Sequence, residues 1–383
     1  MIRKVLFWTH LSMGVAAGLV IALMGVTGVL LTYELQLLRL ADHQYRAAPP
    51  PDAAMLPLET LLATAAEAGA EPGRLTLRRD SADPVLVSAG RRDPGLYLDA
   101  YSGAVLGPPS AAARELISSL RGLHRWLLVE GDQRGTARLV TGISNLVFLL
   151  LIATGLYLWL PRLLRWPLLK PRLLFSGPYR DTRSRDYHWH HVFGIWAALP
   201  LLIITATALV FSFSWANGLV YAAFGESPPV RGASGGGEVR VETAAPMSGV
   251  PLAELVAAAV APYPDWRRVI VHEPNGESAD LRIEVDAGNG RQPHRVTTVY
   301  LSRVTGAVER VAYFQDRTPG RQARSWIRFL HTGEAFGWPG QTLAGIASVV
   351  SLIMVWTGLA LAWRRLIRPM LQRRGTPGMT ADS

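Results

Sequence analysis

The chain has 383 residues, a formal net charge of +10 and 49% hydrophobic residues, and its mean hydropathy is positive. It is long enough for more than one domain and too apolar for an ordinary soluble enzyme, so we expect a membrane protein. The absence of cysteine excludes disulfides, thiolate metal ligands, iron–sulfur clusters and cysteine nucleophiles. Histidine is therefore the main soft ligand available, helped only by methionine.

Four apolar runs are long enough to cross a hydrocarbon core of about 30 Å, which takes about 20 helical residues. They cover about Val5 to Thr32, Leu139 to Leu160, Val192 to Ser214 and Ala344 to Trp363. The first run is longer than the apolar part of a signal peptide and lacks a small-residue cleavage site, so we predict that it is retained. The expected fold is an α-helical membrane protein with four transmembrane helices.

Basic residues gather beside the helix ends in two places. One group lies between the second and third runs and the other in the C-terminal tail: Arg162, Arg165, Lys170, Arg172, Arg180, Arg183 and Arg185, then Arg364, Arg365, Arg368, Arg373 and Arg374. Arginine and lysine at such places mark the cytoplasmic side. We therefore predict that both termini are cytoplasmic, that the two long connections lie outside, and that no nucleic acid is bound.

The two outer connections, about residues 34–138 and 215–340, have the patterns of small α+β domains. The first contains an amphipathic helix in PLETLLATAAEAG and strands in RLTLRRD, VLVSAG and GLYLDAYSGAVLG. After a flexible linker, PPVRGASGGGE, the second repeats this order in PLAELVAAAVAPYP, RRVIVHEP, DLRIEVD and VTTVYLSRVTGAVERV, as helical and period-two patterns indicate.

The chain is expected to divide into alternating membrane and extramembrane segments. The first half has a first helix (1–33), an outer domain (34–123) and a second helix with the outer segment that leads into it (124–160). A basic loop (161–187) connects it to the second half. The second half has a third helix (188–214), a second outer domain (215–330), a fourth helix with the outer segment that leads into it (331–364), and a tail (365–383).

The shared order indicates a tandem repeat. HLSMG at His10 matches HHVFG, where His190 holds the same place, and LRGLHRWLLVEG around His124 matches IRFLHTGEAFG around His331. TGVLLTY also matches TALVFSF, YLDAYSGAVLG matches YLSRVTGAVER, and ATGLYLWL matches WTGLALAW. If an axis along the membrane normal relates the halves, His10 opposes His190 and His124 opposes His331.

Facing histidines, with glycines that make room between the helices, are what a bis-imidazole b-type haem needs. Covalent attachment of haem would need cysteine. The helix from His10 to Thr32 spans about 33 Å, so the two sites would lie near opposite membrane surfaces. We predict two haems b that form a transmembrane electron path, one held by His10 and His190 and the other by His124 and His331.

The ligand on the third helix stays open among His188, His190 and His191, because a helix start is hard to place to one residue. A histidine of this group that does not ligate would contact a haem propionate or the membrane interface. A zinc or copper site in HWHH is disfavoured, since adjacent helical residues point apart and no carboxylate follows at helical spacing.

The remaining polar and aromatic residues near these sites have plainer interpretations. Histidines without a partner at ligand spacing are expected to be solvated: His43, His272 and His294. We expect Met13 and Met24 in core packing. Threonines beside small residues are expected at close helix contacts: Thr27, Thr154, Thr207 and Thr357. Aromatic residues near the outer histidines suit an interfacial belt or a docking surface: Trp126, Trp326, Phe336 and Trp338. Arginines there suit haem propionates or surface charge: Arg121, Arg125, Arg324 and Arg328.

The motifs LHRWLL and HHVFG at the helix starts, with turns of the YLDAYSGAVLG type, resemble the PepSY-associated transmembrane helix family of bacterial inner-membrane proteins. The resemblance covers about residues 1–370 and is closest to the haem-containing ferrisiderophore reductases. It implies two PepSY-like periplasmic domains, two b haems on the four histidines, and reduction of ferric siderophores on the periplasmic side. One departure is HTGEAFG, which lacks after His331 the Arg-Trp pair that follows His124.

No nicotinamide or flavin motif is visible, so the expected electron donor is a quinol or another protein. The expected partners are membrane lipid and a ferric siderophore, whose hard oxygen ligands favour Fe(III) over Fe(II). Two other functions remain open. One is a non-enzymatic membrane adaptor whose outer domains bind siderophore, peptide or a partner. The other is a di-haem oxidoreductase that acts on a quinone, a copper ion or a redox protein.

Overall fold

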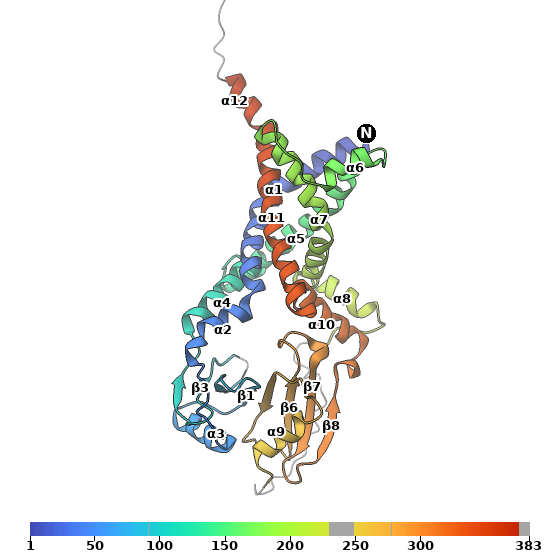
Figure 1. Cartoon of the computed structure of the whole chain (residues 1–383). Coiled ribbons are helices and arrows are strands. Elements are labelled where there is room, and N and C mark those ends of the chain that lie inside the picture. Colours follow the sequence, from blue (N-terminus) through green and yellow to red (C-terminus); the bar gives the residue numbers. More distant parts are fainter. Residues whose placement is uncertain (91, 230–248, 277, 375–383) are drawn as a thin grey trace, which may run out of the picture.

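The computed structural model describes residues 1–90, 92–229, 249–276 and 278–374. A bundle of long helices forms one part of the molecule and an antiparallel sheet the other (Figure 1). We call the end of the bundle next to the sheet the sheet end, and the opposite end, where α6 and α12 lie, the basic end. Most of the predicted glycine-rich linker and residues 375–383 lie outside the described residues.

Within the residues that the structure describes, four helices are long and apolar enough to cross a membrane, as the sequence predicts. They are α1 (Ile2–Thr32), α5 (Arg134–Trp159), α7 (Thr182–Ser212) and α11 (Gly337–Leu366). The helices extend beyond most of the apolar runs because polar residues continue the same hydrogen-bond ladder. Helix α7 begins where the Asp181 carboxylate accepts a hydrogen bond from the backbone N–H of Ser184, as a helix N-cap does.

The four helices form a closed ring in which α1 packs on α5 and α11, and α7 packs on the same two helices. Small residues allow the close approach that membrane helices need: a Cβ at Gly25 of α1 would lie 2.8 Å from the side chain of Leu352 on α11. Across the α5–α7 contact, the Asn145 amide donates to the backbone carbonyl of Thr205 at 2.9 Å.

Shorter helices extend the bundle at both ends. At the sheet end lie α2 (Glu34–Ala41), α4 (Ala111–Trp126), α8 (Ser214–Ala222) and α10 (Pro319–His331), and at the basic end α6 (Trp166–Leu173) and α12 (Arg368–Arg374). Single 3-10 turns cover His43–Tyr45, Gly131–Gln133, Pro293–Arg295, Phe314–Asp316 and Glu334–Phe336.

The strands of both outer segments join one eight-stranded antiparallel sheet, in the order β4-β3-β2-β1-β5-β6-β7-β8. Their bounds are β1 (Arg74–Arg78), β2 (Val85–Ser88), β3 (Leu96–Leu98), β4 (Val105–Gly107), β5 (Arg268–His272), β6 (Asp280–Asp286), β7 (Val296–Ser302) and β8 (Val308–Ala312). The sequence predicted a small domain in each segment. The structure instead fuses them where β1 pairs with β5, which removes an exposed strand edge from each.

One face of the sheet carries α3 (Leu58–Glu67) and α9 (Leu252–Val260), both at places where the sequence predicts amphipathic helices. A single apolar core runs under both helices and includes Leu61, Leu75, Leu255, Ile283 and Leu301. Full burial of such a side chain stabilises the fold by about 1.5–3 kcal/mol, so the shared core favours one sheet over two.

The loop between β6 and β7 ties the sheet to the bundle. Arg291 in this loop donates to Glu34 at the start of α2 (2.8 Å) and to Glu334 just before α11 (3.1 Å). The Glu334 side chain is buried, so Arg291 supplies the counter-charge that a buried carboxylate requires.

Candidate functional site

The first histidine pair lies inside the bundle towards its basic end. His10 on α1 and His190 on α7 have ring centroids 6.4 Å apart, with the ring planes at 86°. A metal ion between two imidazoles, at about 2 Å from each nitrogen, would separate the ring centroids by roughly 6 Å. The pair therefore has the spacing that two axial ligands of one metal ion require.

The second pair lies at the sheet end. His124 near the end of α4 and His331 at the end of α10 also have ring centroids 6.4 Å apart, at 61°. Burial, with a smaller contribution from the neighbouring His331, lowers the pKa of His124 to about 4; burial also lowers the pKa of His331. Both imidazoles are neutral at pH 7, which is the form that binds a metal ion.

We call His10 with His190 the inner pair and His124 with His331 the outer pair. A threonine hydroxyl fixes the orientation of each imidazole of the inner pair. The Oγ1 of Thr154 on α5 lies 2.9 Å from Nδ1 of His10, and that of Thr357 on α11 lies 2.9 Å from Nδ1 of His190. The Thr357 hydroxyl donates its own hydrogen to the carbonyl of Ile353, so its oxygen accepts from the histidine N–H. This hydrogen bond selects the tautomer in which Nε2 is the free lone pair.

The outer pair follows the same pattern with one difference. Thr27 Oγ1 on α1 lies 2.9 Å from Nδ1 of His124. Thr207 on α7 lies 3.3 Å from Nδ1 of His331, which also reaches the carbonyl oxygen of Ile204 at 3.0 Å. His331 therefore shares its N–H between a hydroxyl and a main-chain carbonyl, whereas Thr27 contributes the hydrogen bond at His124.

Glycine follows the threonine in three of the four cases and leaves space for the ring. A Cβ at Gly155 would lie 3.3 Å from Cε1 of His10, and one at Gly358 would lie 3.3 Å from Cε1 of His190. At Gly28 the corresponding distance to His124 is 3.7 Å, and Ala208 takes this place in the fourth case.

The sequence had suggested these threonines as helix contacts, and it missed their bonds to the histidines. The available signal was the equal offset between histidine and threonine in the two halves. It could not be converted into contacts, because each threonine lies on a helix other than that of its histidine.

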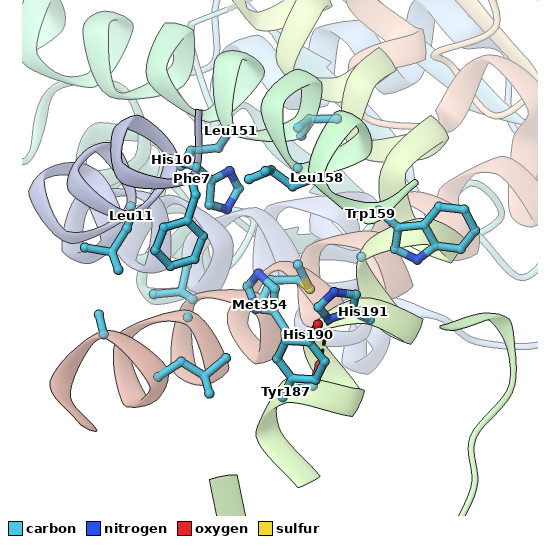
Figure 2. Close-up of a pocket in the computed structure, with 18 of the residues that line it drawn as sticks. Phe7, His10, Leu11, Leu151, Leu158, Trp159, Tyr187, His190, His191 and Met354 are labelled. Atoms are coloured by element: carbon cyan, nitrogen blue, oxygen red, sulfur yellow. Dashed lines mark hydrogen bonds between the residues drawn. The ribbon is translucent and has the colours of Figure 1, made fainter. Parts of the chain in front are cut away.

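A cavity of about 730 Å³ surrounds the inner pair. Figure 2 shows that His10 and His190 line it with Phe7, Leu11 and Met354. The wall is mostly apolar, and basic residues gather towards the basic end: Arg3, Lys4, Arg162, Arg183, Arg364 and Arg365. A large, flat, apolar ligand with anionic groups at one edge fits these surroundings.

One wall residue has an unsatisfied donor. The indole Nε1 of Trp159 is buried and has no hydrogen-bond partner within the part of the chain that the structure describes. Since a buried N–H without an acceptor is costly, this donor suits an acceptor carried by a ligand in the cavity.

The neighbouring histidines have other partners. The Nε2 atom of His188 lies 3.0 Å from the carbonyl oxygen of Leu174. His191 donates from Nδ1 to the carbonyl of Tyr187 (2.9 Å) and packs on its ring. His191 still lines the cavity, but His190 is the member of this cluster whose ring lies against His10. Because α7 starts well before the cluster, successive residues point to different helix faces.

The arginines near the outer pair are close to one another. Burial lowers the pKa of Arg125, and the positive charges of Arg138, Arg121, Arg134 and Arg328 lower it further. Arg121 forms an ion pair with Glu34. Arg324 donates to Asn217 at 2.8 Å. The guanidinium groups of Arg125 and Arg134 lie 4.8 and 3.8 Å from the centre of the Trp126 ring. This end of the bundle therefore concentrates positive charge, which attracts anions.

The remaining aromatic side chains near the sheet end divide into two groups. Trp326 stacks on His294 with centroids 5.0 Å apart and planes at 7°, and it also contacts Phe336. Phe336 and Trp338 are exposed, as either an interfacial belt or a docking surface would require.

The three histidines without a predicted partner differ from one another. His43 and His294 are exposed. His272 is not simply solvated, because its Nε2 lies 3.0 Å from the Glu284 carboxylate on the next strand. Burial would raise the pKa of Glu284, but the hydrogen bond and charge of His272, with those of Arg282, lower it to about 2.

The family model of the PepSY-associated TM region matches residues 7–365. The chain belongs to this family. Membership of this family, expected from the helix-start motifs, is thereby confirmed, and all four paired histidines lie within the matched range. A comparison with curated proteins finds no match.

Proposed function

We propose that this PepSY-associated protein is a di-haem b oxidoreductase of a bacterial inner membrane. It passes electrons across the membrane, reduces ferric siderophore in the periplasm and releases Fe(II). The observation that carries the proposal is the pair of matched sites: His10 with His190 and His124 with His331, each with ring centroids 6.4 Å apart and each imidazole bonded through Nδ1.

The residues around the inner pair fit a b-type haem. His10 and His190 would hold the iron through Nε2, and Gly155 and Gly358 keep the imidazole edges free of side-chain atoms. The Trp159 indole N–H, with basic residues such as Arg183, would bind the propionates. A bound haem supplies a reversible one-electron carrier.

At the outer pair, His124 and His331, whose ring centroids have the same spacing, would be the ligands, and Arg125 and Arg328 would bind the propionates. His188 and His191 are not proposed as iron ligands. The His188 ring contacts a backbone carbonyl, and His191 lines the cavity. The chain's contribution is to position the ligands and tune their basicity, rather than to provide acid–base catalysis.

The charge distribution supports an orientation. The basic end carries the loop between α5 and α7 and the tail after α11, so the positive-inside rule places it in the cytoplasm. The sheet, with the outer pair next to it, then lies in the periplasm. Ferric siderophore would dock beside the outer pair, where exposed Phe336 and Trp338 and the arginines of α4 and α10 lie. The donor on the other side is a quinol or a redox protein.

A visible spectrum of the purified protein tests the proposal. Dithionite should produce the sharp band pair of low-spin haem, and pyridine extraction should give two haems b per chain. His190→Ala and His331→Ala should each lose one haem, whereas His188→Ala should keep both. A colourless protein would refute the proposal and favour a non-enzymatic adaptor.

The substrate is tested separately. Reduced protein mixed with ferric siderophore and a ferrous chelator should form the coloured Fe(II) complex, at a rate that falls in His331→Ala. If the protein contains two haems but forms no Fe(II), the siderophore proposal is wrong. The protein is then a di-haem oxidoreductase with another acceptor, such as a quinone, a copper ion or a redox protein.

A further inference from the structure

The segment between α5 and α7 exposes large apolar side chains next to basic ones. Leu164 is 72% exposed and Trp166 60%, and Leu163, Leu168 and Phe175 are exposed as well. The stretch from Leu160 to Arg180 contains no acidic residue. Exposed apolar groups interleaved with uncompensated positive charge are typical of segments that lie in the headgroup region of a membrane.

The main chain of this segment is held firmly against the bundle. The Trp196 indole donates to the carbonyl of Leu173 at 2.8 Å, His188 contacts the carbonyl of Leu174, and the Arg172 guanidinium donates to the carbonyl of Trp159. These bonds satisfy carbonyls at the ends of α5 and α6, which near hydrocarbon have no water to bond. These hydrogen bonds therefore hold the main chain in the position that leaves Trp166 exposed.

A pocket of about 470 Å³ is lined by residues from the start of α1, from the loop just after α5 and from α6. Its polar residues are Arg3, Arg162 and Arg172, and its other walls are Pro161, Pro167, Leu168 and Pro171. Arg3 donates to the carbonyls of Leu158 and Leu160 at 2.6 and 3.0 Å. In the ranges that the structure describes, Arg162 has no hydrogen bond or ion pair, and its charge is therefore available to an anion.

We infer that this pocket binds the headgroup of an anionic phospholipid. The phosphate contacts Arg162 with Arg3 and Arg172 around it, and the acyl chains run along Leu163, Leu164 and Trp166. A lipid is favoured over a soluble phosphate or an acidic protein because the exposed apolar residues continue the outer surface of the spanning helices, where Val5 and Tyr157 are also exposed. Arg3 and Arg162 also line the cavity around the inner pair, so the test of this site measures lipid binding and not haem content.

Native mass spectrometry of the full-length protein in detergent tests this site. The protein is titrated with phosphatidylglycerol and, separately, with phosphatidylcholine of the same acyl chains. Phosphatidylglycerol should remain bound at concentrations where phosphatidylcholine does not. Arg162→Gln should weaken its binding about fivefold, the usual effect of one arginine near an anionic lipid. Arg180→Gln removes the same charge outside the pocket and should bind as the unmodified protein does.

Two further measurements separate the sources of the phosphate. Millimolar inorganic phosphate should not displace the lipid, and Leu164→Gln, which removes an apolar contact at an exposed position without adding charge, should weaken lipid binding without unfolding the protein. Equal retention of the two lipids, equal loss in Arg162→Gln and Arg180→Gln, or displacement by inorganic phosphate would each overturn the inference.

Discussion

The hydrogen bond between Thr357 and His190 allows a sharp test of how the inner site is organised. Thr357→Val keeps the shape of the side chain and removes the oxygen that lies 2.9 Å from Nδ1 of His190. Thr357 is 0% exposed, so no water replaces the lost acceptor. The imidazole N–H then loses its hydroxyl partner, or the ring turns away from its present orientation.

The expected loss follows from this burial. A buried donor without a partner costs about 1–3 kcal/mol, which corresponds to roughly 5- to 150-fold in binding. Partners of metal ligands typically contribute about 10- to 100-fold to affinity. We therefore expect Thr357→Val to weaken haem binding at the inner pair about 10- to 100-fold, measured by titrating apo-protein with haem and following the Soret band. Thr357→Ser, which retains the hydroxyl, should restore most of the affinity.

Thr205 on α7 provides a matched control. Its hydroxyl donates to the carbonyls of Leu201 and Leu202 at 2.8 and 3.2 Å, as the Thr357 hydroxyl does to those of Ile353 and Met354. Thr205 is also buried but contacts no histidine in the hydrogen bonds of the described chain. Thr205→Val should leave haem affinity unchanged. If Thr357→Val binds haem as tightly as the unmodified protein, or if Thr205→Val loses as much, the proposed role of the hydroxyl is wrong.

Three further changes have expected outcomes. Gly358→Ala brings a Cβ to 3.3 Å from an imidazole and should reduce haem content at the inner pair, whereas Gly28→Ala, at 3.7 Å, should be tolerated; equal haem content in both variants would count against the spacing argument. Because the folded-state pKa of Glu284 is depressed from 4.5 to about 2, its contribution to stability is complete above pH 4.5 and is lost as the pH falls towards 2. Glu284→Gln should remove about 2 kcal/mol of this pH-dependent stability, seen as a flatter dependence of the melting temperature on pH. Arg291→Gln leaves the Glu334 carboxylate buried without its counter-charge and should destabilise the junction of sheet and bundle by about 2–4 kcal/mol, measured by thermal unfolding; an unchanged melting temperature would contradict this role.

Much of the architecture follows from local patterns that need no partner to be recognised. A run of about 20 apolar residues has few alternatives to a membrane helix, so the four spans were predictable one at a time. The strands and amphipathic helices of the outer segments were also predictable, because their periods of 2 and 3.6 residues are properties of each segment alone. The pairing of the histidines needed one more step, the comparison of offsets between the two halves.

Tertiary structure decided the features that depend on groups from distant segments. The pairing of β1 with β5 could not be read from either strand, since each strand was assigned to a separate small domain and the gain lies in a core that both segments share. The position of His190 among its neighbours was set by the start of α7 and by the Leu174 carbonyl, which engages His188. The threonine bonds depended on helix rotation about the long axis: a turn of a few tens of degrees would move Thr357 away from His190, and only the packing of all four helices sets that angle.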